Sequence, residues 1–258
     1  MSTLAGLPVI RGETTIPPSG GWFGTYLLNS STLPALGPTA LVMHDLVLVG
    51  RIIRRDFDDH PGGALVTATV QGGAGWRLPV TRAGSYASSG GVRLSTVLRD
   101  LAAMAGESYA APAELSLGTS YAWQAHTPTS PVHGADILAD LVWRRFVSTW
   151  RVEPFTGVTR FDAWPSLGRA DGRGRIVTRD LARGRRTIGL DVAVRAFLPG
   201  ATIEDAIITR TVLRETASDL RALVYSFDVG ASTVTGASAS STAQRTAETP
   251  RGAATVRP

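Results

Sequence analysis

Short runs of strand-forming residues, each closed by a cluster of turn residues, constrain the fold of this chain more than any other feature. Between residues 20 and 82, runs rich in valine, leucine, isoleucine, threonine and aromatic side chains lie at 22–28, 39–43, 46–54 and 64–71. His44-Asp45 has the length of a tight turn, and residues 56–63 (DFDDHPGG) predict a second, longer turn. Strands this short, at this spacing, predict a small β-barrel or sandwich.

Two segments have the periodicity of amphipathic helices. In residues 90–107, apolar side chains recur at intervals of three and four positions while polar side chains take the other face. Gly106 stands where a glycine commonly ends a helix, so we expect a helix over residues 91–106. Residues 135–148 follow a proline-rich break and repeat the pattern, with Asp136 in the first turn, where the helix dipole favours an acidic residue.

Strand patterns return after each helix. Residues 113–123 predict a strand after the first helix, and residues 149–164 predict a hairpin after the second. Four further runs predict strands at 175–181, 187–194, 206–215 and 222–228, with a turn at 197–206. The sequence therefore predicts a mainly β (α+β) chain of two small β-barrel or sandwich domains, each with a flanking α-helix.

The expected domain boundaries follow from these elements. The first domain takes residues 1–132 and includes the first helix, and the second takes residues 133–228 and includes the second helix. Residues 229–258 differ in kind, because 20 of these 30 residues are alanine, serine, threonine or glycine and none is aromatic. Such a composition cannot form a core of its own, so we expect an extended C-terminal arm.

Length and composition exclude several protein classes. A chain of 258 residues buries a sizeable core without covalent cross-links, and the absence of cysteine excludes disulfide scaffolds, thiolate zinc sites and thiol nucleophiles. The most apolar window, residues 40–53, contains three polar side chains and is too short to span a bilayer. The N-terminal residues lack the apolar core of a signal peptide. We expect a soluble protein that is made in the cytoplasm and has no membrane partner.

Positive charge is concentrated in residues 167–186. This stretch has seven arginines against Asp171 and Asp180, a net charge of +5 that equals the net charge of the whole chain. All 26 basic residues are arginine, as a G+C-rich genome would produce, which weakens a functional interpretation of each one. We take six of them as candidates for a charged interface or lumen: Arg169, Arg173, Arg175, Arg183, Arg185 and Arg186.

Two interpretations of the arginine-rich stretch stay open. Clustered arginines favour salt-dependent, sequence-independent binding of nucleic acid. Against this, residues 175–181 alternate like a strand and the glycines lie at turn positions. The six tryptophans are spread from residue 22 to residue 164 rather than grouped as a stacking platform. The preferred interpretation is a charged hairpin that meets an acidic partner surface.

Few side chains have the sequence spacing that is typical of catalytic or metal-binding sites. Residues 56–60 combine three carboxylates with a histidine but lack the ligand spacing of a calcium loop. His126 and His133 lack a zinc-binding motif. A phosphate-binding loop requires a helix directly after its glycines, and no helix is predicted after the glycines at 72–75. No G-x-S-x-G motif occurs. We expect no metal, no cofactor and no enzymatic activity. A hydrolase built on two converging carboxylates stays an alternative.

Several segments also carry a resemblance to a known family. They are LVLVGRIIR (46–54), VQGGAGWRLPV (70–80), SYASSGGVRLSTVLRDLAAMAGE (85–107), ADILADLVWRRFVSTWRVEPFTGVTRFDAWP (135–165), LPGATIED (198–205) and ITRTVLRETASDLRALVY (208–225). Together they resemble the baseplate or tail hub proteins of tailed bacteriophages, of the late-control protein D type. The resemblance covers roughly residues 40–228, and its most specific element is the helix within 91–107.

The resemblance implies a structural role in the virion. Such hubs assemble as rings, commonly trimers whose two barrels imitate six-fold symmetry. They join the tail tube or distal tail protein and the tape-measure protein to the tail spike or fibre proteins. For this chain the resemblance implies synthesis in the host bacterial cytoplasm and a place at the tail tip. We predict that Arg183, Arg185 and Arg186 face either an acidic neighbouring subunit or the lumen through which DNA passes. The alternative is an arginine-driven nucleic-acid-binding module without sequence specificity.

Overall fold

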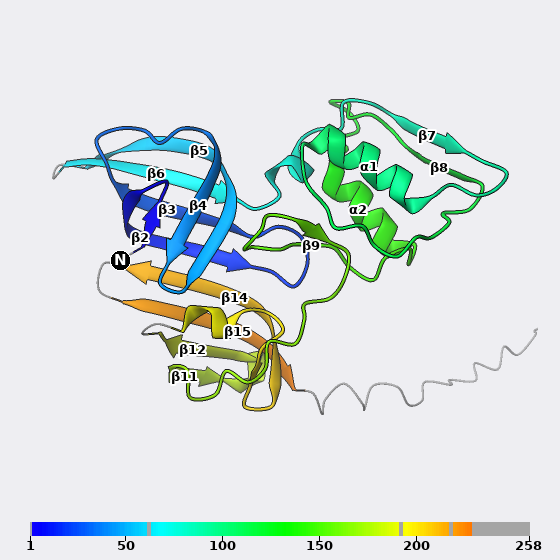
Figure 1. Ribbon diagram of the computed structural model, residues 1–258. Helices are drawn as coiled ribbons and strands as arrows, with labels where there is room; N and C mark the ends of the chain where they lie inside the picture. Colours follow the sequence, from blue (N-terminus) through cyan, green and yellow to red (C-terminus); the bar gives the residue numbers. More distant parts are fainter. Residues whose placement is uncertain (1, 61–62, 191–192, 217–218, 229–258) are drawn as a thin grey trace, which may run out of the picture.

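The computed structural model describes residues 2–60, 63–190, 193–216 and 219–228 (Figure 1). It is mainly β, with two α-helices in the described residues, so the expected mainly β class is confirmed. Neither of these helices has the length and hydrophobicity needed to cross a bilayer. The expected C-terminal arm, residues 229–258, lies outside the described residues.

A closed barrel forms the N-terminal part of the fold. Its strands are β1 (Thr3–Leu4), β2 (Leu7–Ile16), β3 (Phe23–Asn29), β4 (Gly37–Met43), β5 (Leu46–His60) and β6 (Gly63–Gln71). They pair antiparallel in the order β1-β4-β5-β6-β3-β2, and β1 also pairs with β2, which closes the ring. Along β3, buried and exposed side chains alternate, because successive side chains of a strand point to opposite faces.

Trp22 fills one end of the barrel because two glycines leave room for its ring. The Trp22 side chain is fully buried, and its Nε1–H donates to the backbone oxygen of Val49 at 3.2 Å. A Cβ atom on Gly72 would lie 2.3 Å from Trp22 Nε1, and one on Gly50 would lie 2.8 Å from the ring. Both glycines are therefore required by the close approach of the indole.

The two predicted turns of the barrel have different outcomes. His44-Asp45 does separate β4 from β5, with His44 at a φ of 52°. The turn predicted at residues 56–63 is too long, because β5 continues to His60 and β6 begins at Gly63, so the connection is confined to the two residues between them. Cross-strand pairs such as Phe57 with Val66 hold these residues in the ladder, and the pairing outweighs the turn preference of the aspartates.

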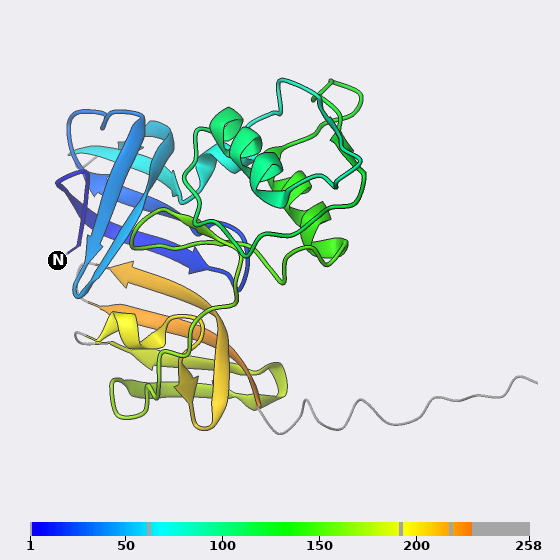
Figure 2. The ribbon, with the colours of Figure 1, turned by 45° about the vertical axis from the view of Figure 1, so that its right-hand side comes forward.

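A helical unit follows the barrel and has its own core. Its elements are η1 (Ala74–Arg77), β7 (Gly84–Ala87), α1 (Leu94–Ala105), β8 (Ser120–Trp123), α2 (Gly134–Trp143), β9 (Arg151–Val152) and β10 (Thr159–Arg160). The two helices lie side by side in both views (Figures 1 and 2). Their apolar faces share one cluster with Trp76, which is fully buried and donates to Thr159 Oγ1 at 2.7 Å. The glycines at 72–75 lead into the single 3₁₀ turn of η1, with Gly73 in the left-handed conformation at a φ of 67°.

The sequence pattern predicted the end of α1 correctly but not the end of α2. Helix α1 ends as predicted, with Gly106 in the left-handed conformation at a φ of 64°. Helix α2 ends at Trp143, five residues before the predicted end. Arg145 adopts a φ of 62°, and Phe146 N–H donates back to the Leu141 oxygen at 2.9 Å. This reversal brings Val147 into the buried cluster, which a continued helix would not do.

A second β unit extends the sheet of the barrel. It contains β11 (Arg175–Asp180), η2 (Leu181–Arg183), β12 (Arg185–Gly189), η3 (Val194–Phe197), β13 (Thr202–Ile203), β14 (Ala206–Thr216) and β15 (Leu220–Asp228). Strand β14 pairs with β2 of the barrel, and the path continues through β15 and β12 to β11, giving one sheet of eleven strands among the described residues. The short helix η3 packs Val194 and Phe197 onto the core that this unit shares with the barrel.

The distribution of the helices differs from the expected plan. Both helices belong to one cluster, rather than one to each β domain, because their apolar faces are buried against each other and against η1. The predicted division between residues 132 and 133 runs through this cluster. The domain boundaries stay a prediction that the sites of limited proteolysis would test.

Candidate functional site

The arginine-rich stretch folds into a hairpin at the end of the eleven-stranded sheet. We call β11, η2 and β12 (residues 175–189) the basic hairpin. The two strands are antiparallel and place Arg179 opposite Arg186, and Asp180 opposite Arg185. Gly184 ends η2 at a φ of 60°, and a Cβ atom there would lie 2.4 Å from the Ser226 backbone oxygen. Only glycine allows β12 to begin so close to β15.

An acidic turn lies against the basic hairpin. Glu204 and Asp205, with φ of 47° and 64°, form the two-residue connection between β13 and β14. Positive φ at both positions is typical of the tight turns that join paired strands, although glycine or asparagine is usual there. Asp171 stabilises the turn by accepting the Glu204 N–H at 3.0 Å, a bond that contributes most to lowering the pKa of Asp171.

The Glu204 carboxylate joins two arginines of the basic hairpin. Its Oε1 accepts from Arg179 at 2.6 Å, and its Oε2 accepts from Arg186 at 2.8 Å. Hydrogen bonds from these two guanidinium groups, first Arg179 and then Arg186, lower the pKa of Glu204 to about 2. The carboxylate is therefore ionised at neutral pH, and it connects the acidic turn to both strands of the hairpin.

Arg186 has an internal role, unlike the other five candidate arginines. Its side chain is 4% exposed, and besides Glu204 it donates to Ser226 Oγ on β15. A buried guanidinium must have such partners, because burying an unpaired charge is costly. Its burial leaves Arg186 little surface for a lumen or a neighbouring subunit.

The other candidates lie at the surface with different partners. Arg169 pairs with Asp171 at 2.9 Å and with Asp205 at 3.0 Å. Arg185 pairs with Asp180 at 2.8 Å, which is the main cause of the lowered pKa of that carboxyl, and Arg183 lies 3.8 Å from the same carboxylate.

Arg173 and Arg175 are exposed and form no ion pair within the part of the chain that the structure describes. The structure thus brings Arg183, Arg185 and Arg186 to one hairpin and leaves Arg169, Arg173 and Arg175 along the approach to it.

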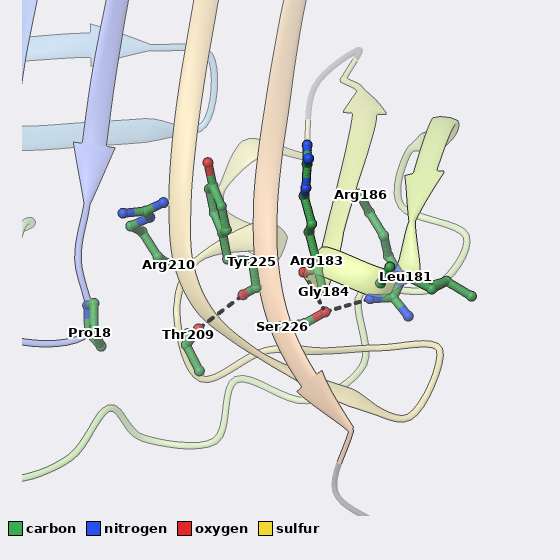
Figure 3. A pocket seen from close by; sticks show the side chains of 10 residues that line it. Pro18, Leu181, Arg183, Gly184, Arg186, Thr209, Arg210, Tyr225 and Ser226 are labelled. Carbon is green, nitrogen blue, oxygen red and sulfur yellow. Dashed lines mark hydrogen bonds between the residues drawn. The ribbon is translucent and has the colours of Figure 1, made fainter. Parts of the chain in front are cut away.

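A pocket of about 530 Å³ lies beside the basic hairpin (Figure 3). Its walls come from the β2–β3 connection at Pro18, from η2, and from β14 and β15. Arg183, Arg186 and Arg210 all line it. Figure 3 shows the guanidinium of Arg186 turned toward Ser226, whereas Arg183 and Arg210 extend on either side of Tyr225.

Tyr225 lies next to an arginine on each of its two neighbouring strands. It lies directly opposite Arg210 on β14 and opposite Arg185 on β12, in one cross-strand row. The Arg210 guanidinium lies 3.8 Å from the centre of the Tyr225 ring, in the range of a cation–π contact. Thr209, the extra residue of a β-bulge next to Arg210, donates its hydroxyl to the Tyr225 backbone oxygen at 3.2 Å.

Glu204, Asp205, Arg210 and Tyr225 were not among the candidates from the sequence. The pattern at 197–206 predicted a turn, but nothing local connects its acids with arginines some twenty residues earlier. Arg210 and Tyr225 fall inside ordinary strand patterns. Only the pairing of β12, β15 and β14 brings these side chains together.

The other groups considered in the sequence have structural partners. His126 and His133 do meet, with ring centres 5.4 Å apart. However, the Nδ1 of His126 accepts from the Val132 N–H at 3.1 Å, and the Nδ1 of His133 lies 3.2 Å from an Asp136 oxygen. No group of three or more histidine, aspartate or glutamate side chains within the described ranges is placed to hold a metal ion.

The fold is similar to that of solved tail proteins. No protein-family model and no curated protein matches the sequence. A tail protein from Neisseria meningitidis MC58 is 12% identical with a TM-score of 0.55, and the match covers 89% of this chain and 96% of that one. The 43 kDa tail protein of prophage MuSo2 from Shewanella oneidensis is 9% identical with a TM-score of 0.56, covering 87% of this chain and 96% of that one.

A third similar structure comes from a secretion system. The c3393 protein of Escherichia coli is a component of the type VI secretion system and is described as similar to the T4 bacteriophage tail proteins gp27 and gp5. It is 10% identical with a TM-score of 0.56, and the match covers 89% of this chain and 77% of that one. This chain therefore has the fold of phage tail proteins and of a related secretion component.

Proposed function

We propose that this chain is a structural subunit of a phage-type tail baseplate hub. In this role, copies of the chain form a ring, a trimer in the simplest case, at the tail tip. The ring joins the tail tube or distal tail protein and the tape-measure protein to the spike or fibre proteins, and DNA passes through its lumen. The subunit is made in the host bacterial cytoplasm and has no catalytic task.

One observation supports this proposal above the others. The sheet begins in a closed barrel and runs through β14, β15 and β12 to β11, where its path ends. An unpaired edge strand offers backbone groups to another chain, and charged side chains on the edge restrict which chain can approach. Strand β11 carries exposed Arg175 and Arg179. A ring needs such a surface to meet a different surface of the next copy.

The carboxylates with shifted pKa values fit a structural role. Glu204, Asp171 and Asp180 all have lowered pKa values because N–H donors of the chain itself hold them. Burial raises the pKa of Glu107, whose Oε1 accepts the N–H of Gly75 at 2.6 Å. Each of these groups is used to connect two segments of the fold.

Hydrodynamic measurement of the full chain tests the proposed function. Size-exclusion chromatography with light scattering, at low and high salt and with added duplex DNA, should give a discrete oligomer whose mass does not change with DNA. A monomer that binds DNA with a steep salt dependence would instead support the nucleic-acid-binding alternative. Release of fragments from purified peptidoglycan would overturn the non-enzymatic assignment.

A further inference from the structure

The pocket beside the basic hairpin contains more positive charge than the nearby carboxylates neutralise. Arg183, Arg186 and Arg210 line it. Two carboxylates bind arginines of this region: Glu204 is shared between Arg186 and Arg179, and Asp180 is held by Arg185 at 2.8 Å. Arg183 is 3.8 Å from that same carboxylate and its side chain is 72% exposed. The Arg183 charge is therefore only weakly compensated.

Arg210 is prepared to accept an anion. It forms no ion pair with any residue in the described ranges, and the carbon of its guanidinium lies over the Tyr225 ring, 3.8 Å from the ring centre. A guanidinium that stacks on an aromatic ring uses its face and leaves its N–H edges available to an acceptor. The ring also restricts the side chain, so less conformational entropy is lost when an acceptor binds.

The walls of the pocket restrict what can enter. Pro18 and the exposed Leu181 contribute apolar surface to its rim. A volume of about 530 Å³ is in the range of sites that enclose a few side chains or a small molecule. Duplex DNA is a rigid rod with phosphates on its outside and needs an open basic surface or groove rather than a pocket of this size.

We propose that this pocket receives an acidic segment of a neighbouring protein, with carboxylate side chains bound between Arg183 and Arg210. Apolar side chains of the same segment then contact Pro18 and Leu181. The buried Arg186 contributes positive potential from the wall of the pocket without leaving Glu204. The inference rests on the proposed function only in assigning the segment to another tail protein.

Fluorescence anisotropy with a labelled hexaglutamate peptide tests the pocket in the full-length chain. The variants are Arg183→Ala and Arg210→Ala, singly and together, because neither residue holds a carboxylate of the fold at normal ion-pair distance. Arg173→Ala is the matched control, since it removes the same charge from an exposed site outside the pocket. Arg210→Lys tests whether the planar group is required in addition to the charge.

We expect each pocket variant to lower the affinity for the peptide about tenfold, as the loss of one charged hydrogen bond does. The control should have little effect on the affinity. Arg210→Lys should lose part of the affinity. Equal weakening by the pocket variants and by Arg173→Ala would overturn the proposal in favour of a general basic surface. Displacement of the peptide by a single-stranded oligonucleotide, with the same dependence on Arg183 and Arg210, would overturn it in favour of a nucleic-acid site.

The oligomeric state separates a wrong pocket assignment from a wrong hub assignment. Each variant is also measured by light scattering. Absence of peptide binding in a chain that forms the expected ring overturns the pocket assignment alone. Peptide binding in a chain that stays monomeric supports the pocket and contradicts the hub.

Discussion

Arg186 and Glu204 form an ion pair in which the arginine is buried: the Arg186 Nε lies 2.8 Å from Glu204 Oε2, and the arginine side chain is 4% exposed. The pair connects β12 to the turn between β13 and β14, 18 residues further along the chain. Because Arg179 binds the other oxygen of the same carboxylate, one acidic side chain holds both strands of the basic hairpin.

Replacing Arg186 should destabilise the second β unit. Arg186→Met keeps much of the side-chain volume but removes the donors to Glu204 and Ser226. We expect the free energy of unfolding to fall by about 1–3 kcal/mol, since Ser226 Oγ and one oxygen of Glu204 lose their donor while Arg179 still binds the other oxygen. Urea denaturation measures the change. Arg183→Met, at an exposed site, is the control and should change stability by less than about 0.5 kcal/mol; equal effects at both positions would contradict the internal role.

The stability of the protein should depend on pH through Glu204. Its pKa is lowered from 4.5 to about 2 in the folded protein, so its contribution to stability is fully present above pH 4.5 and is lost as the pH falls toward 2. The variant Glu204→Gln removes this titration. Denaturation curves at a series of pH values should show a shallower loss of stability below pH 4.5 in the variant, and parallel pH profiles would refute the assignment.

Gly12 should not accept a side chain. A Cβ atom at Gly12 on β2 would lie 2.4 Å from Tyr26 Cδ1 inside the barrel, so Gly12→Ala should cost about 1–3 kcal/mol through overpacking. Gly189→Ala is the control in another strand, because its nearest neighbour would be Val177 Cγ2 at 3.6 Å. In a Tyr26→Ala background the cost at Gly12 should largely disappear, which a double-mutant cycle measures.

The same change at two tryptophans of the helical unit should affect stability to very different degrees. Trp76 is fully buried and hydrogen-bonded, whereas Trp143 at the end of α2 is 86% exposed. Trp76→Ala should cost about 3–5 kcal/mol, and Trp143→Ala less than about 0.5 kcal/mol, by thermal or urea unfolding. A large loss of stability in Trp143→Ala would mean that this side chain supports the fold rather than a contact with another protein.

Charge reversal at the approach to β11 tests the proposed ring. Arg173→Glu with Arg175→Glu changes two exposed residues that form no ion pair within the described ranges. We expect the oligomer to dissociate at protein concentrations where the wild type remains assembled, with an unchanged circular dichroism spectrum and unfolding midpoint. The same two changes to alanine give the graded control. A variant that assembles normally would remove β11 from the interface.

Local patterns predicted those elements whose causes are local. The alternating residues of β3, the turn at His44-Asp45 and the glycine that ends α1 each depend on neighbours within a few positions, and all three are present in the structure. The same reasoning failed at residues 56–60, where three aspartates and a histidine, with Phe57 among them, continue β5. Pairing with β6 decided that segment, and a partner strand is not visible in the preference of single residues.

The charge of the candidate site was predictable, but its arrangement was not. Counting residues located an excess of arginine between 167 and 186, because net charge is a sum over the sequence. Two of these arginines, Arg186 and Arg169, form ion pairs with Glu204 and Asp205, which belong to a separate turn. The sequence gives no sign of which arginines form such pairs. The position of Arg210 beside Tyr225 likewise depends on the register of two strands.

By itself, therefore, the sequence determined the mainly β class, the helices and the location of the positive charge, since periodicity, turn chemistry and charge are properties of short segments. Tertiary structure alone decided that β14 pairs with β2 to make one continuous sheet, that both helices share one core, and that Arg186 is buried while Arg183 is exposed. These outcomes depend on contacts between residues far apart in the chain. Such contacts form where apolar faces are buried and backbone N–H and C=O groups are hydrogen-bonded at the same time. No single segment can meet both requirements without a partner segment.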